Sequence, residues 1–261
     1  MQKLLRKLKR AMMDSDPSFC DMYEDAHSRQ AAQEYLSHIR PALKDAFGDK
    51  TLTILDAGCQ AGRLLIPLAQ DGHRLIGVDT SGFALRRARR HAEQLHVSVE
   101  LHEGNLSRLR RWVSPVSLDV VICTEVLYLC PDYRQLLKLL ADSLKPGGLL
   151  CASHRPVAFY AGAALKRGDA EMASSVLRRS EGPSPDGAYH NWQTRQQLEA
   201  LYQEAGAAVL RCEPVDHTSM ALDLSHVDDA GVIQLLNSWH QADSTYRIPQ
   251  YVLMIAQRLG T

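Results

Sequence analysis

The chain has 261 residues, with 30 Lys and Arg against 30 Asp and Glu, so its formal net charge is zero. Hydrophobic residues make up 45% and charged residues 23%, which is ordinary for a globular protein. The zero net charge provides no overall field that would attract nucleic acid. The length suits one large domain or a domain with a cap, and we predict a single domain over residues 1–261.

The six cysteines include no C-x-x-C pair, which argues against a zinc site or a dithiol redox motif. Several lie in apolar runs, where a reduced cysteine is usually a small buried side chain. No apolar run has the length needed to span a bilayer. We therefore predict a cytoplasmic protein with no metal site.

The N-terminal segment "MQKLLRKLKRAMMD" carries five Lys and Arg in its first ten residues. Leu4, Leu8 and Met12 recur every four residues, so a helix here would be amphipathic. No apolar core of a secretory signal follows. Two interpretations stay open: a terminal helix that is solvated or locally packed, and weak contact of residues 1–13 with a membrane surface.

From residue 50 onward, predicted strands and helices alternate. The strands are mostly continuous apolar runs, which is typical of a parallel sheet covered by helices on both faces. "KPGG" at 145–148 stops a helix before a strand, and the final segment "QYVLMIAQRL" alternates as a strand does. The order predicts a doubly wound α/β sheet. Strands are expected at 52–56, 74–79, 98–102, 118–123, 149–153, within "AAVLRCEPV", and at 250–259; helices are expected at 62–70, 82–95, 105–112, 132–144 and 194–204.

Three segments do not fit this alternation. Residues 1–47 are predicted to be helical and to precede the core, which comprises 50–153, 194–214 and 249–259. Residues 154–193 and 215–248 are insertions, the first with a helix and the loop "SEGPSPDGAYHNW", the second with a helix near 229–240. Both leave from the carboxyl ends of strands, where open α/β sheets bind ligands, so we predict that they form a cap that selects the substrate.

The turn "LDAGCQAG" at 55–62 indicates a cofactor loop. Asp56 ends the first strand, and Gly58 and Gly62 flank the turn before a helix N-terminus. The spacing G-x-x-x-G differs from the G-x-G-x-x-G of dinucleotide-binding proteins. A carboxylate at Asp56 disfavours a pyrophosphate and favours a cationic ligand. S-adenosylmethionine (SAM), which carries an amino group and a sulfonium and no phosphate, suits this loop.

The ends of the next strands offer further cofactor contacts. Asp79 in "LIGVDTS" suits the two ribose hydroxyls, with a helix N-cap as the alternative. Asn105 in "EGNL" suits the adenine amino group, again with an N-cap as the alternative, and Leu106 suits the adenine ring. Thr124 and Glu125, at the end of the fourth strand, are expected near the sulfonium.

These motifs together carry a resemblance to a known family. "LDAGCQAG", "GVDTS", "EGNL", "LDVVICTEVLYL" and "LKPGGLL" resemble, in order and spacing, the motifs of class I SAM-dependent methyltransferases. The resemblance implies a seven-stranded, mostly parallel sheet with an antiparallel last strand, in which the glycine loop holds the methionine part of SAM. The predicted cofactor-binding residues are Asp56, Gly58, Cys59, Gln60, Gly62, Asp79, Thr80, Asn105, Leu106, Thr124 and Glu125.

Two positions depart from the common family pattern. Gln60 stands where the loop often has glycine, and Asn105 stands where many members have aspartate. Asparagine still presents a carbonyl oxygen as an acceptor. The Gln60 side chain is expected either to point out of the loop or to reach the carboxylate of the cofactor.

The segment "CTEVLYLC" bears on the methyl acceptor. It lacks the Asn-Pro-Pro-Tyr type of motif that resembles adenine and glutamine-amide methyltransferases. It is similar to S-E-V-x-E-H-V of ubiquinone-pathway O-methyltransferases, where Glu125 and Val126 match. Tyr128 and Leu129 replace the Glu and His that the resemblance associates with metal-assisted deprotonation, so a divalent-metal mechanism is not expected.

The resemblance implies transfer of a methyl group to an O or N nucleophile of a small, hydroxylated or aromatic molecule, giving S-adenosylhomocysteine (SAH) by in-line displacement. Two alternatives stay open: a non-catalytic SAM-binding protein on the same fold, and a quinone-type O-methyltransferase at a membrane surface. Arg155 suits an acidic acceptor, and Tyr23 and His27 are expected one helical turn apart, closing over the cofactor. The candidate catalytic residues are Glu125, His154 and His190, and the candidate substrate contacts are Tyr23, His27, Tyr128, Arg155 and Tyr160.

Overall fold

The structure, a computed structural model, describes residues 20–183 and 187–260. The amphipathic segment predicted at 1–13, with its membrane contact, lies outside the described residues. Within the described part of the chain, no helix combines the length and the apolar character needed to cross a membrane.

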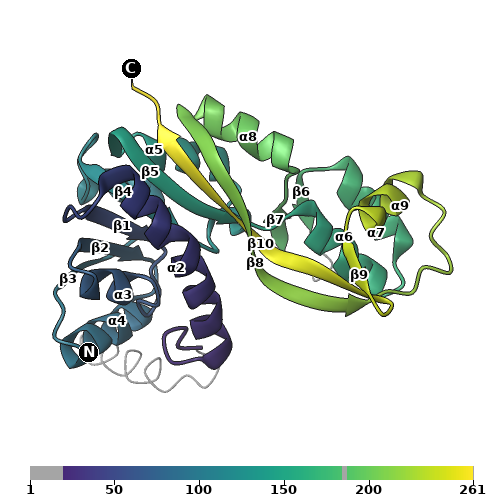
Figure 1. Cartoon of the computed structure of the whole chain (residues 1–261), viewed down its shortest axis with the longest axis horizontal. Coiled ribbons are helices and arrows are strands. Elements are labelled where there is room, and N and C mark those ends of the chain that lie inside the picture. Colours follow the sequence, from purple (N-terminus) through teal and green to yellow (C-terminus); the bar gives the residue numbers. More distant parts are fainter. Residues whose placement is uncertain (1–19, 184–186, 261) are drawn as a thin grey trace, which may run out of the picture.

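The centre of the molecule is a mixed β-sheet (Figure 1). Its main strands are β1 (Thr53–Ala57), β2 (Arg74–Asp79), β3 (Val99–Glu103), β4 (Leu118–Cys123), β5 (Leu144–His154), β8 (Ala207–Ala221) and β10 (Thr245–Arg258). They lie in the order β3-β2-β1-β4-β5-β10-β8. The first five pair in parallel, and β10 runs antiparallel to both of its neighbours. The predicted fold class is confirmed; the short β9 (His240–Ala242) adds a strand beside β10 that the sequence did not indicate.

Helices cover both faces of the sheet. One layer holds α2 (Ala26–Phe47), α3 (Leu65–Gln70) and α4 (Gly82–Gln94); the other holds the 3₁₀ segments η1 (Leu106–Arg111) and η2 (Leu127–Leu129) with α5 (Tyr133–Ala141) and α8 (Arg195–Glu204). Consecutive side chains of a strand pack into opposite helical layers, because side chains alternate between the two faces of a sheet. Ile54 and Ile122 are buried toward α2, whereas Leu55 and Val121 are buried toward α5.

Several elements differ from the sequence prediction. The strand expected at 149–153 begins at Leu144, so "KPGG" lies inside β5 and does not precede it, and the helix before it ends at Ala141. The helix expected at 62–70 begins at Leu65, because Gly62 has φ 94° and cannot belong to a right-handed helix. The helix expected at 105–112 is the 3₁₀ segment η1, with non-helical backbone angles at Arg108.

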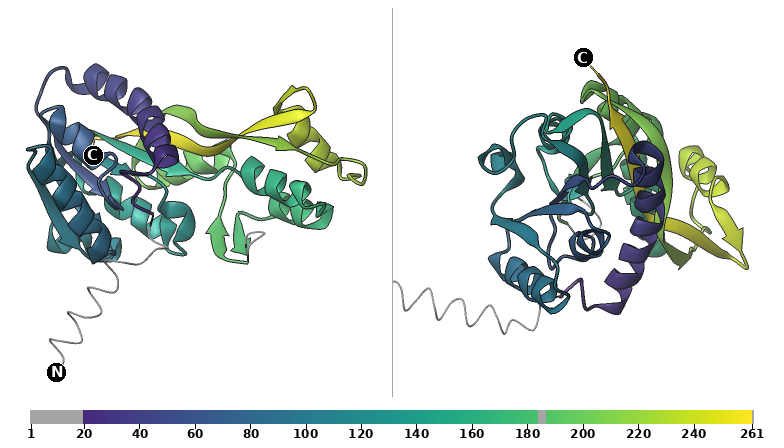
Figure 2. Two further views of the ribbon diagram at one scale, coloured as in Figure 1. Left: turned by 90° about the horizontal axis from the view of Figure 1, so that it is seen from below. Right: turned by 60° about the vertical axis from the view of Figure 1, so that its left-hand side comes forward.

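A second lobe extends from the core on the outer halves of β8 and β10 (Figures 1 and 2). It contains α6 (Val157–Lys166), α7 (Ala170–Arg178) and α9 (Ala230–Asn237), and these helices pack on the two strands. β10 begins at Thr245, earlier than the predicted 250, because Tyr246 pairs with Met220 across the ribbon and both side chains are buried in the lobe.

A small hairpin lies between the two lobes. It consists of β6 (Glu181–Pro183) and β7 (Tyr189–Asn191), where the sequence predicted a loop. The amide of Asn191 donates to the carbonyl oxygen of Leu127 at 2.8 Å, which fastens the insertion to the segment that follows β4. The hairpin therefore adjoins the edge of the sheet where the cofactor loop lies.

Candidate active site

The glycine turn after β1 approaches its neighbours closely. Gly58 has φ 87°, and a β-carbon added there would lie 2.3 Å from Cγ2 of Val126, beyond the end of β4. The amide nitrogens of Gly58 and Cys59 both donate to the carbonyl oxygen of Val78 at the end of β2. The backbone of this turn is thus held against two strand ends, in a conformation that glycine adopts readily.

Asp79 links the glycine turn to the start of α4. One carboxylate oxygen accepts from the amide of Gln60 at 3.0 Å, and the other accepts from the amide of Ser81 at 2.8 Å. The N-cap of α4 is Ser81, whose hydroxyl accepts from Ala84, so the alternative that Asp79 is the N-cap is wrong. Each oxygen of Asp79 retains acceptor capacity for a hydroxyl group. Thr80 follows as an exposed residue.

Asp56 is buried at the end of β1. Burial raises the pKa of its carboxyl to about 7, against the lowering effect of the Arg63 charge. A bound cation would shift this equilibrium toward the carboxylate. Asp56 therefore suits the predicted contact with a positively charged ligand.

An ion pair that the sequence pattern did not indicate lies next to Asp56. Arg63 donates from Nη2 to Oε1 of Glu125 at 2.5 Å, and their side chains are 7% and 15% exposed. Glu125 has φ 62°, and its amide donates to the hydroxyl of Ser153 on β5 at 2.7 Å. The signal for Arg63 was a lone charge in the apolar helix start "RLLIPL". The pairing means that the carboxylate of Glu125 is already engaged by a cation.

The side chain of Gln60 points out of the loop. Gln60 has φ 45°, its Nε2 donates to the carbonyl oxygen of Cys20 at 2.7 Å, and its Oε1 accepts from the amides of Met22 and Ala61. Of the two predicted orientations, the structure has the outward one. Gln60 thereby connects the cofactor loop to the segment that precedes α2.

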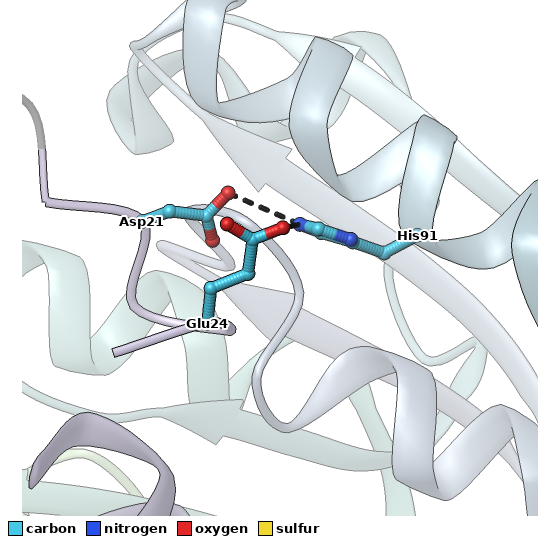
Figure 3. A group of neighbouring side chains, drawn as sticks. All are labelled: Asp21, Glu24 and His91. Carbon is cyan, nitrogen blue, oxygen red and sulfur yellow. Dashed lines mark hydrogen bonds and ion pairs between the residues drawn. The ribbon is translucent and has the colours of Figure 1, made fainter. Parts of the chain in front are cut away.

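The same segment is attached to α4 by three side chains (Figure 3). His91 shares a hydrogen bond of 3.1 Å between Nε2 and Oδ2 of Asp21, and Glu24 lies 4.0 Å from the same nitrogen. Tyr23 stacks on the His91 ring with centroids 4.5 Å apart. The ligand atoms of Asp21, Glu24 and His91 lie within 4.8 Å of one another, close enough to hold a cation. The carboxylate–imidazole bond and the ring stack already account for the arrangement without one.

The structure contradicts the expected pairing of Tyr23 with His27 on one helix face. The side chain of Asp25 caps α2 by accepting from Ser28, so the helix begins after Tyr23. His27 is exposed and pairs with Asp216 of β8 at 3.3 Å. Tyr23 instead lines a cleft of about 320 Å³ that Arg63 also borders.

Asn105 is the N-cap of η1. Its side-chain oxygen accepts from the amide of Ser107 at 2.8 Å, as one of the two alternatives predicted. Leu106 packs into the core beside β4. The contacts of Asn105 and Leu106 with adenine stay predictions.

The structure contradicts the candidacy of His154 as a base. Ser153 and His154 are consecutive in β5, so their side chains point to opposite faces of the sheet. Ser153 meets Glu125, whereas His154 hydrogen-bonds with the hydroxyl of Tyr202 on α8 at 3.0 Å and is 1% exposed. Burial lowers the pKa of His154 to about 4. His154 is therefore a neutral core residue.

The remaining acceptor candidates gather beyond the ends of β4 and β5. Arg155 lies over the rings of Tyr128 and Tyr251, and donates to the hydroxyl of Tyr251 at 2.9 Å. The ring centroid of His190 on β7 is 5.5 Å from those of Tyr128 and Tyr160. The sequence pattern did not indicate a role for Tyr251, because its contact with Arg155 joins residues far apart along the chain. Thr124, also predicted here, is buried beside Glu125.

The fold, the antiparallel β10 and the glycine turn with Asp79 define this protein as a class I methyltransferase by architecture. A family profile described as a methyltransferase domain matches residues 54–148. The chain is 30% identical over 225 residues to a ubiquinone biosynthesis O-methyltransferase of Methylocella silvestris, covering 85% of this chain and 76% of the relative. The chain belongs to the class I SAM-dependent methyltransferases.

Two further comparisons show how far the similarity to known proteins extends. The match to the ubiquinone biosynthesis O-methyltransferase of Idiomarina loihiensis is 36% identical, but covers 39% of this chain and 40% of that relative. A solved structure of a putative S-adenosylmethionine-dependent methyltransferase from Listeria monocytogenes superposes on this chain with a TM-score of 0.61 at 16% identity. The superposition covers 88% of this chain and 100% of the other. This second likeness supports the fold alone. The enzyme uses SAM as the methyl donor and yields SAH, as its family does.

Proposed function

We propose that this enzyme methylates an oxygen nucleophile of a small hydroxylated aromatic molecule. The observation that carries the proposal is a connected group of aromatic side chains beyond β4 and β5. Arg155 lies over the rings of Tyr128 and Tyr251, and His190 contacts the rings of Tyr128 and Tyr160. Tyr251 is close enough to Glu125 to feel its charge, which places the group beside the edge of the sheet where the cofactor loop lies, called here the cofactor edge. Aromatic side chains favour flat ring systems through stacked and edge-on contacts. The O-methyltransferase activity named for the Methylocella silvestris relative supports the same class of acceptor.

The residues at the cofactor edge suit a cationic donor. Asp56, Asp79 and Glu125 bring three carboxyl groups around the turn, and Arg63 is engaged with Glu125. We assign Asp79 to the ribose, because its two oxygens are already oriented by backbone amides. When bound, SAM supplies a methyl group on a positively charged sulfur, which is activated without help from the protein.

The protein must then align the acceptor oxygen with the methyl carbon and exclude water. The hairpin that carries His190 is hydrogen-bonded to Leu127, in the segment that follows β4, and would help to exclude water from the site. A hydroxyl acceptor loses its proton as the oxygen–carbon bond forms and the carbon–sulfur bond breaks. Of the predicted bases, His190 suits this role better than Glu125, because the carboxylate of Glu125 is paired with Arg63.

The test is turnover of the full chain with SAM and a panel of catechols, phenols and aromatic amines. The expected result is SAH formation, together with an acceptor product that mass spectrometry identifies as carrying one added methyl on oxygen. Products methylated only on nitrogen, or turnover restricted to aliphatic acceptors, would contradict the proposal. Cytoplasmic location, the absence of nucleic acid among the partners and the capping role of residues 154–193 and 215–248 stay predictions.

The His190 assignment has its own measurement. His190→Gln is expected to lower kcat about 100-fold, within the usual range for loss of a general base, with little change in SAM affinity. The pH dependence of kcat should lose its ascending limb in this variant. An unchanged pH profile would remove His190 as the base.

A further inference from the structure

Arg155 holds its charge among aromatic rings. Its guanidinium carbon lies 4.7 Å from the ring centroid of Tyr128, 4.5 Å from that of Phe159 and 5.1 Å from that of Tyr251. Its Nη2 donates to the Tyr251 hydroxyl at 2.9 Å and to Oε1 of Gln250 at 3.4 Å. Burial raises the pKa of Tyr251, so its hydroxyl stays neutral. These contacts orient the guanidinium, and each of these partners is uncharged.

No described carboxylate neutralises Arg155. It takes part in no ion pair with the residues that the structure describes, and its enclosed Nε makes no hydrogen bond to them. Asp216 meets the far side of Gln250 and is paired with His27. The contrast with Arg63 is direct, because that arginine is paired with Glu125. Arg155 is half-buried, so its charge is partly withdrawn from water without an ionic partner; this costs free energy, and a bound anion would recover part of it.

Arg155 lies close to the residues that we propose take part in the reaction. It is the first residue after β5, two positions beyond Ser153, whose hydroxyl accepts from the amide of Glu125 at the cofactor edge. The ring of Tyr128 lies between Arg155 and His190, and the ring centroids of Tyr128 and His190 are 5.5 Å apart. A flat molecule lying along Tyr128 would have one end at Arg155 and its body near His190 and the cofactor edge.

We propose that Arg155 binds a carboxylate of the methyl acceptor, so that the preferred acceptors are small hydroxylated aromatic acids. The planar guanidinium matches the geometry of a carboxylate, and its position over aromatic rings suits an acid attached to a ring. This inference rests on the proposed function and names the substrate class of the same site. It concerns recognition; the reacting oxygen is the ring hydroxyl.

The experiment compares three catechols of similar ring: protocatechuate, which carries a carboxylate; protocatechuamide, which is neutral; and dopamine, which is cationic. Turnover with SAM is measured for the full-length wild type, for Arg155→Gln and for Arg195→Gln. Arg195 lies on the surface of α8 and pairs with Glu199, so it controls for the loss of a positive charge. Calorimetry measures binding of each catechol to the SAH complex, and SAH affinity reports that the fold is intact.

The expected result is that wild type prefers protocatechuate, and that Arg155→Gln lowers kcat/KM for it about 10- to 100-fold, the range for a lost hydrogen bond to a charged group. The loss should be mainly in KM, with dopamine and protocatechuamide little changed and Arg195→Gln behaving as wild type. Equal losses for all three acceptors would overturn the proposal, since Arg155 would then act on the reacting phenolate or on the fold. Equal wild-type turnover of the three would overturn it while leaving the proposed function standing.

Binding separates the two ideas when turnover fails. If none of the catechols is methylated but protocatechuate binds the SAH complex in an Arg155-dependent way, the recognition inference stands and the proposed function falls. If protocatechuate binds wild type and Arg155→Gln equally, or does not bind at all, the recognition inference is overturned.

Discussion

The cofactor edge and the aromatic group around Arg155, called here the acceptor region, hold their partly or fully buried charges in different ways. At the cofactor edge, Asp79 is fixed by backbone amides, one of them Gln60, which lies 19 residues away along the chain, and Arg63 is neutralised by Glu125. In the acceptor region, Arg155 is held by rings and by Tyr251, 96 residues away along the chain. At the cofactor edge the arginine has its ionic partner within the chain. In the acceptor region Arg155 has no ionic partner among the described residues, and we propose that the acceptor supplies it.

The largest effect is expected from breaking the buried pair at the cofactor edge. Arg63→Met should destabilise the fold by about 3–5 kcal/mol, because it leaves the Glu125 carboxylate buried and unpaired. Arg63→Met combined with Glu125→Gln should recover part of this loss in a double-mutant cycle. Urea unfolding measures Arg63→Met, Glu125→Gln and the double variant, with Arg40→Met as the control for an exposed pair, where about 0–1 kcal/mol is expected. Equal losses from Arg63→Met and Arg40→Met would remove the distinction between the two regions.

Crowding of the glycine turn is expected to have the next effect. Gly58→Ala combines a positive φ with a β-carbon 2.3 Å from Val126, and should cost about 2–5 kcal/mol together with most of the SAM affinity. Gly72 is the matched control, because it has φ 89° with open space around it. Gly72→Ala should cost only about 1–2 kcal/mol and leave SAM affinity unchanged. Similar behaviour of the two variants would show that the close approach to Val126 is unimportant.

Acid sensitivity should come from the core beneath the acceptor region. The pKa of His154 is about 4 in the fold and about 6.5 when unfolded, so the unfolded chain binds more protons between these values. His154 stabilises fully above pH 6.5 and should lose about 3 kcal/mol as pH falls to 4. Asp56 acts in the opposite sense, because its raised pKa of about 7 stabilises at low pH and the effect is lost as pH rises through 7. The difference in unfolding free energy between wild type and His154→Gln, measured against pH, isolates the histidine; a flat difference would contradict its neutral burial.

Loss of Asp79 should lower affinity for the cofactor, together with some stability, because its carboxylate also accepts from two backbone amides. Asp79→Ala is expected to weaken SAM binding tenfold or more, because hydrogen bonds of about 1.5–3 kcal/mol to a charged acceptor are lost. Asp71→Ala, on the turn after α3, is the control. Calorimetry with SAH checks both variants, and an unchanged dissociation constant for Asp79→Ala would refute the ribose assignment.

The smallest effect is expected at the connection between the cofactor loop and residues 20–22. Gln60→Ala removes hydrogen bonds to Cys20 and Met22, which are worth about 1 kcal/mol each at most in this partly exposed position. SAM affinity should fall about 2- to 5-fold, and proteolysis near Asp21 should become faster. A loss as large as that of Asp79→Ala would mean that Gln60 contacts the cofactor itself.

The cofactor half of the protein was predictable because its information is local. Strand periodicity, the glycine spacing and acidic residues at consecutive strand ends fix β1, β2, β4 and the loop between β1 and α3. Parallel strands must place these ends at one edge, so the residues meet once the fold class is known. The same local pattern could not supply the partner of Arg63, because Glu125 is reached only when β4 pairs beside β1.

The residue pattern was sufficient to predict the α/β class, the family and the edge of the sheet at which the cofactor loop lies. Only the tertiary structure shows that His154 faces the core and Ser153 faces the site. Alternation along β5 puts the two side chains on opposite faces of the sheet but does not say which face each one takes. The tertiary structure also decided that β8 and β10 continue into a second lobe, and that Tyr251 meets Arg155. These contacts join segments far apart in the chain, and their pairing depends on burial of side chains that no local period reveals.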